Sequence, residues 1–145
     1  MERAYNNVVQ IENLIEQFST HVLPEDKWTH QAHLTVAFWY LFNFTIDEAT
    51  CYLRSGIITY NRARGKRSTP TEGYHETITL FWIKVIDNYL KTFPSKLLLE
   101  SCNAFLNSKF SERNYILSFY SKDILATSNA RAFWIEPNLQ NLEVV

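Results

Sequence analysis

Two long segments of this chain are apolar with almost no polar face, and they constrain the fold more than any other feature. They cover residues 34–42 and 78–90, and their apolar residues are Leu34, Val36, Ala37, Phe38, Trp39, Tyr40, Leu41 and Phe42, then Ile78, Leu80, Phe81, Trp82, Ile83, Val85, Ile86, Tyr89 and Leu90. A helix that is apolar nearly all round must be covered on several sides. Each segment therefore predicts a central helix of a multi-helix fold.

The rest of the chain supplies helices to cover those two. Helical spacing of apolar residues predicts helices over residues 7–19, 28–43, 47–64, 74–92 and 95–107. A short sixth helix beyond Ser111, a helical turn or two over 123–130 and a packed extended tail from Arg131 follow. Thr45 and Glu48 form a capping-box pattern, and Gly56 indicates a close helix contact. No segment alternates like a strand, so we expect one all-α domain over residues 1–145, a bundle of five or six helices.

Composition excludes several broad classes. Hydrophobic residues make up 46% of the 145 residues and aromatics 15%, with only three glycines and four prolines, which argues against disorder and a turn-rich β fold. The net charge of -1 gives no global case for nucleic acid. No apolar run reaches the roughly 18 to 20 residues that span a bilayer, and the start does not resemble a signal peptide.

Cysteine usage and aromatic content give two further expectations. Cys51 and Cys102 both fall inside helical patterns, which favours a reduced, buried pair in a cytoplasmic protein over a disulfide. The high aromatic content also makes a homodimer a hypothesis, since aromatic surface often lies at interfaces.

Polar residues cluster where the two central helices begin. His30 and His33 lie three apart in the segment Trp28-Thr29-His30-Gln31-Ala32-His33-Leu34, so they share one helix face. His75 and Glu76 begin the second central helix. We expect the two helix starts to face each other and form one site.

The leading hypothesis for this site is a divalent metal ion, Zn, Fe, Mn or Ni, held by His30, His33 and His75. Imidazole is a common ligand of these metals, and Glu76 would be a further ligand or a general base. Such a site would activate water or a bound substrate, with His75 and Glu76 as the catalytic residues. The spacing differs from His-Glu-x-x-His, so a zinc protease is excluded. His21 is a weaker candidate ligand.

Two alternatives use the same residues without a metal. In the first, a His75–Glu76 pair is general base and orienter in a small-molecule site. Ligand contacts would come from Tyr74, Thr77, Thr79, Trp82 and Asn61, and converging helix N-termini would favour an anionic ligand. In the second, the histidines are structural and the protein is a binding or interaction module.

A basic cluster precedes the second central helix. Arg62, Arg64, Lys66 and Arg67 place four cations in six residues, followed by Ser68 and Thr69. A solvated loop is the favoured interpretation, with an anion contact near the mouth of the site as the alternative. One short cluster on a slightly acidic chain does not indicate nucleic-acid binding.

Four segments together resemble a known family. Trp28-Thr29-His30-x-x-His33-Leu34, Tyr60-Asn61, Gly73-Tyr74-His75-Glu76-Thr77-Ile78-Thr79 and the tail Arg131…Glu136-Pro137-Asn138-Leu139 look like a family of small, mostly bacterial helical proteins of no established activity. The resemblance covers about residues 25 to 140. It implies an all-helical single domain and marks the His and Glu positions, but it names no substrate. The family tail usually reads Glu-Pro-Asp, so Asn138 puts a carboxylate role there in doubt.

Overall fold

The computed structural model describes residues 2–142, and every regular element in that range is a helix. The five longer helices are α1 (Val8–Ser19), α2 (His30–Asn43), α3 (Ile46–Ala63), α4 (Glu76–Thr92) and α5 (Leu98–Leu106). The shorter elements are η1 (Glu25–Lys27), η2 (Lys109–Ser111), η3 (Arg113–Ser118), α6 (Lys122–Leu125) and α7 (Ser128–Ala132). The predicted all-α fold is confirmed.

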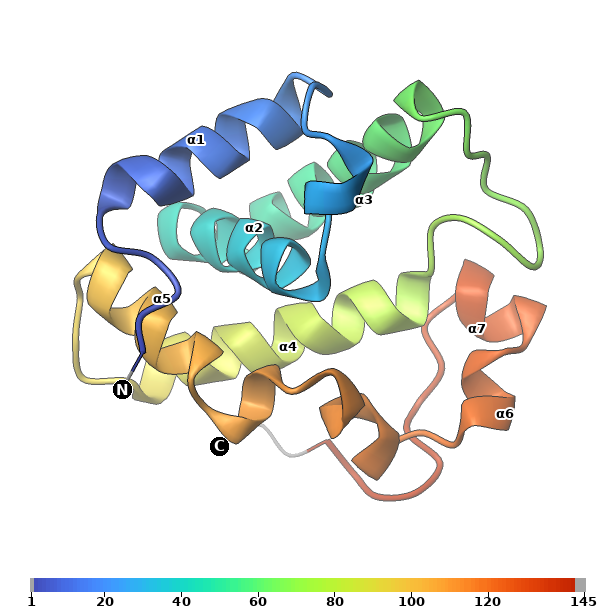
Figure 1. Ribbon diagram of the computed structural model, residues 1–145. Helices are drawn as coiled ribbons and strands as arrows, with labels where there is room; N and C mark the ends of the chain where they lie inside the picture. The colour runs from blue at the N-terminus through green and yellow to red at the C-terminus, as the bar shows by residue number, and fades with distance from the viewer. Residues whose placement is uncertain (1, 143–145) are drawn as a thin grey trace.

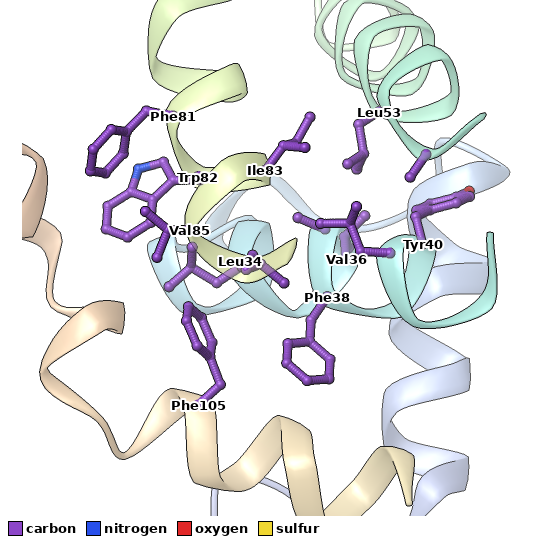
Figure 2. Packing of buried hydrophobic residues seen from close by; sticks show 14 of the residues in the cluster. Leu34, Val36, Phe38, Tyr40, Leu53, Phe81, Trp82, Ile83, Val85 and Phe105 are labelled. Carbon is purple, nitrogen blue, oxygen red and sulfur yellow. The ribbon is translucent and has the colours of Figure 1, made fainter. Parts of the chain in front are cut away.

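The two apolar segments form the centre of the bundle, as predicted. Helix α2 packs against α1, α3, α4 and α5, and α4 packs against α2, α3, α5 and α7 (Figure 1). Side chains of α2 such as Leu34 and Val36 lie beside Ile83 and Val85 of α4, and Phe105 of α5 approaches from another side (Figure 2). This burial is the main stabilising contribution to the fold.

Side-chain caps fix where the longer helices begin. Thr29 accepts a hydrogen bond from the Ala32 N–H, and Thr45 forms the predicted capping box with Glu48. Helix α4 starts after His75, whose ring accepts a hydrogen bond from the Ile78 N–H. The starts predicted at residues 28 and 74 were therefore two residues early, because Thr29 and His75 occupy the cap positions.

Gly56 marks a close approach of α3 to α1, as the sequence indicated. A Cβ atom added at Gly56 would lie 2.9 Å from Cε2 of the buried Phe18 ring. That separation is too short for any side chain to fit without displacing Phe18.

The second half of the chain differs more from the sequence prediction. Residues 113–118 form a 3₁₀-helix where an α-helix was expected, and α5 begins at Leu98, three residues after the predicted Ser95. Cys51 is exposed and Cys102 is buried, both as free thiols, so the expected burial holds for one of the two. Within residues 2–142, no helix has both the length and the apolar character needed to cross a membrane.

The tail packs on the body of the protein, as predicted. The Thr77 hydroxyl on α4 donates to the Phe133 carbonyl and accepts from the Ile135 N–H, at 2.7 and 3.2 Å. The Tyr120 hydroxyl donates to the Ile135 carbonyl. Phe133 is nevertheless 64% exposed, so this part of the tail contacts the body through its backbone.

Candidate functional site

A cavity of about 300 Å³ lies at the N-terminal end of α2, between α2, α3 and α4. Most of its walls are apolar, and Arg113 of η3 lies among its lining residues. The residues around it are Trp28, Thr29, His30, His33, Leu34, Ala37, Leu53, Ile57, Ile78, Thr79, Trp82, Ile83 and Arg113. The structure thus brings together His30, His33, Thr79 and Trp82, four of the residues singled out from the sequence.

His33 is held by its neighbours in one tautomer. Its Nδ1 atom lies 2.7 Å from the Thr29 carbonyl oxygen, and its ring stacks on Trp28 with centroids 3.7 Å apart. A carbonyl only accepts, so Nδ1 carries the hydrogen and Nε2 keeps a lone pair. Burial, with smaller contributions from His30 and Arg113, outweighs the hydrogen bond to the Thr29 carbonyl and lowers the pKa of His33 to about 4. His33 is therefore neutral near pH 7.

His30 has the opposite arrangement. Its Nε2 atom lies 2.8 Å from the Ser111 carbonyl oxygen, so Nε2 carries the hydrogen and Nδ1 keeps the lone pair. Its ring meets Trp82 edge-on, with centroids 5.3 Å apart. Burial lowers the pKa of His30, and the nearby Arg113 charge adds to this. Among residues 2–142, neither lone-pair nitrogen has a hydrogen-bond partner.

Arg113 supplies the one formal charge among the residues that line the cavity. It is the first residue of η3, and its side chain is exposed, with no ion pair to any of residues 2–142. Its charge contributes to the lowered pKa of both His30 and His33. The lining of the cavity is therefore mostly apolar, with two neutral imidazole rings and one cation.

His75 does not join the other two histidines. Its Nδ1 accepts from the Ile78 N–H at 3.1 Å, and its Nε2–H donates to the Leu125 carbonyl at 2.7 Å. Both ring nitrogens thus hold the start of α4 against α6, and burial lowers the pKa of the ring. Because His75 is a helix cap and does not line the cavity, the expected convergence of His30, His33 and His75 is not observed.

The metal hypothesis requires His30, His33 and His75 around one ion, and the structure separates His75 from the other two. Within residues 2–142, no group of three or more His, Cys, Asp and Glu side chains is placed to hold a metal ion. His21 is also absent from the cavity lining, in a loop where it adopts a positive φ of 64°. Metal binding by His75 through Nδ1 would require this ring to give up the hydrogen bond that it accepts from the Ile78 N–H.

Glu76 is engaged in a clamp between α3 and α4. Its two carboxylate oxygens accept from Arg54 Nε at 3.1 Å and Nη2 at 2.7 Å, and the Tyr74 hydroxyl donates to it at 2.6 Å. Burial alone would raise the pKa of Glu76, but the hydrogen bonds from Arg54 and Tyr74 outweigh it and lower the pKa. Glu76 is not among the residues lining the cavity.

The remaining predicted contacts are divided between two places. Thr79 lines the cavity while its hydroxyl donates to the His75 carbonyl at 2.8 Å. Tyr74 lines a separate surface depression with Arg131 and Phe133. The side chain of Asn61 lines neither, and the Asn61 carbonyl accepts from the Lys66 N–H at the end of α3.

The basic cluster lies away from the cavity. Lys66 pairs with Glu25, and Arg64 donates to the carbonyls of His21 and Leu23, so two of its four cations serve local structure. Lys66 and Arg67 line a surface depression that includes Arg131. The favoured interpretation, a solvated loop, agrees with the exposure of Arg62, Lys66 and Arg67, and the alternative contact near the mouth of the site is not observed.

Comparisons with protein-family models, with curated proteins and with solved structures found no match to this chain. The geometry and chemistry of the cavity are therefore the basis for assigning a function.

The histidines should make stability depend on pH. A folded-state pKa of about 4 for His33 means that the unfolded chain binds a proton more readily between about pH 6.5 and 4. His33 should then lower the free energy of unfolding by up to about 3 kcal/mol as the pH falls through this window. Urea unfolding from pH 7 to 4.5 should show a shallower pH slope for His33→Gln than for the unmodified protein. An unchanged slope would contradict the neutral state of His33 at pH 7.

Removing the His75 ring should destabilise the fold through two lost hydrogen bonds. We expect His75→Ala to lower the free energy of unfolding by about 2 to 3 kcal/mol, because the Ile78 N–H and the Leu125 carbonyl both lose a partner. His75→Asn should recover part of this loss by restoring the cap. Asn7→Ala, which removes only a cap, is the control and should cost about 1 kcal/mol. A His75→Ala loss no larger than that of the control would contradict this role.

Proposed function

We propose that this protein binds a small organic molecule in the cavity beside α2, with His30 and His33 as hydrogen-bond acceptors for it. The observation that supports this most is the pair of neutral imidazoles, each with one nitrogen bonded to a backbone carbonyl and one without a partner among residues 2–142. A volume of about 300 Å³ with mostly apolar walls and a few polar groups is typical of small-ligand sites.

Binding fits these residues better than acid–base catalysis does. A general base works best when its pKa lies near the working pH, and His33, with a pKa of about 4, is a weak base. The carboxylate of Glu76 is committed to Arg54 and Tyr74. We therefore propose a binding protein, and place the catalytic interpretation of His75 and Glu76 second.

A divalent metal ion is the second candidate ligand. Two lone-pair nitrogens three residues apart on α2 favour it, and neutral rings need not lose a proton to bind Zn, Fe, Mn or Ni. Catalytic zinc sites usually have three protein ligands, so two histidines would leave water or substrate to complete the coordination. The positive charge of Arg113 opposes a second cation in the same cavity.

Two further proposals concern the compartment and the oligomeric state of the protein. An exposed free thiol at Cys51 suits a reducing compartment, so we propose the cytoplasm. Tyr52 is 49% exposed and stacks with Tyr40 at the end of α2, which is aromatic surface that a homodimer would bury.

Phenol and toluene are a matched pair of probes for the cavity, since they have similar shapes and only phenol donates a hydrogen bond. Titrations followed by NMR should show saturable binding of both. His33→Leu, which keeps an apolar contact with Trp28, should lower the phenol-to-toluene affinity ratio roughly fivefold, the effect of one lost hydrogen bond. Ile57→Trp should block both probes, and Ser55→Trp, on the exposed side of the same helix, should block neither. Absence of saturable binding, or an unchanged ratio in His33→Leu, would contradict the proposal.

The same samples can be compared with metal present. Protein purified without an affinity tag should contain little bound metal, and added Zn, Fe, Mn or Ni should leave the melting temperature unchanged. Stoichiometric metal that is lost in both His30→Leu and His33→Leu would favour the second candidate.

A further inference from the structure

We propose that the ligand of the cavity is a small carboxylate with a flat body that also carries an O–H or N–H donor for His30 and His33, and that Arg113 determines the preference for the carboxylate. This inference rests on the proposed function. It adds the chemical class of the ligand and a specificity residue outside the histidine motif.

The charge balance of the cavity favours an anion. No Asp or Glu lines it, His30 and His33 are neutral, and Arg113 carries the one formal charge among the lining residues. A charge beside apolar walls interacts more strongly than a charge in open water. The Arg113 charge would repel a cationic ligand and attract an anionic one.

Arg113 is available to bind such a group. Its side chain makes no hydrogen bond or ion pair with any of residues 2–142, in contrast to Arg54 and Arg64, which are both engaged. A guanidinium offers parallel N–H donors that match the two oxygens of a carboxylate. Arg113 can therefore hold a carboxylate at the mouth of the cavity.

His30 holds the segment that carries Arg113. Its Nε2–H donates to the Ser111 carbonyl, two residues before Arg113, and the Ser111 hydroxyl donates to the carbonyls of Leu106 and Ser108. The start of α2 and the segment leading to η3 are thus joined across 81 positions of sequence. We assign His30 as a positioning residue for Arg113, in addition to its place in the cavity wall.

The walls suit a flat apolar body. The Trp28 and His33 rings stack with an interplanar angle of 30°, Trp82 lies edge-on to His30, and Ile57 and Ile78 complete the apolar lining. Aromatic and branched aliphatic surfaces of this kind stack favourably on flat rings. A carboxylate at Arg113 would leave such a body directed toward these walls.

Benzoate and its neutral isostere benzamide test the inference. The full chain should bind benzoate roughly tenfold more tightly than benzamide at low salt, as expected for a charge-assisted hydrogen bond. Raising the ionic strength should reduce this preference, because Arg113 is exposed. Arg113→Gln should abolish the preference and leave benzamide binding within about twofold of the unmodified protein, since the apolar walls are unchanged.

Arg62→Gln, at an exposed arginine near the end of α3, is the matched control and should keep the full preference. His30→Gln should reduce benzoate binding more than benzamide binding, because it releases the segment that carries Arg113. If His30 only stabilised the fold, the binding of both probes would fall equally. Equal binding of the two probes, or a preference that survives Arg113→Gln, would overturn the carboxylate inference and leave the proposed cavity function standing. Failure of both probes and of phenol and toluene to bind would overturn the proposed function, and the carboxylate inference with it.

Discussion

The contact between α2 and α4 is the interaction on which the rest of the structure depends. Each helix is covered by several others, and their shared core removes most of the apolar surface of both from water. The cavity lies at one end of this contact, where residues 28–34 meet residues 78–83. The same burial that stabilises the fold lowers the pKa of His30 and His33 and keeps both rings neutral.

Backbone carbonyls divide the three helix-start histidines into two roles. His75 uses both ring nitrogens in hydrogen bonds, one with an N–H of its own helix and one with the Leu125 carbonyl. Both bonds stabilise the fold. His30 and His33 each use one nitrogen for a carbonyl and keep the other. A histidine with one fixed nitrogen is oriented in a single tautomer, which suits it for specific recognition.

Local patterns in the sequence predicted much of the fold and part of the site. Periodicity identified the five longer helices, the two central ones among them. The structure places the Trp28 to Leu34 segment at a cavity that Thr79 and Trp82 also line. The caps were visible too, at Thr45 and Glu48. These features depend on residues only a few positions apart, so sequence alone can show them.

Contacts between distant parts of the chain could not be predicted in the same way. A histidine that caps α4 and a histidine that lines a cavity leave the same sequence pattern, so His75 was grouped with His30 and His33. Arg113 belongs to no motif, and it reaches the cavity through a segment anchored by the His30–Ser111 hydrogen bond. Arg54 pairs with Glu76 across 22 positions. Residues 111–120 are dense in apolar side chains without a clear period, which explains why a 3₁₀-helix was mistaken for an α-helix.

The tautomers of the histidine rings test the account most directly. Long-range ¹H–¹⁵N correlation NMR at pH 7 reports which nitrogen of each ring carries the hydrogen. The structure indicates neutral rings at His30 and His33, with the hydrogen on Nε2 in His30 and on Nδ1 in His33. A doubly protonated His33, or the same tautomer in both rings, would contradict the two free acceptor nitrogens on which the proposed ligand site depends.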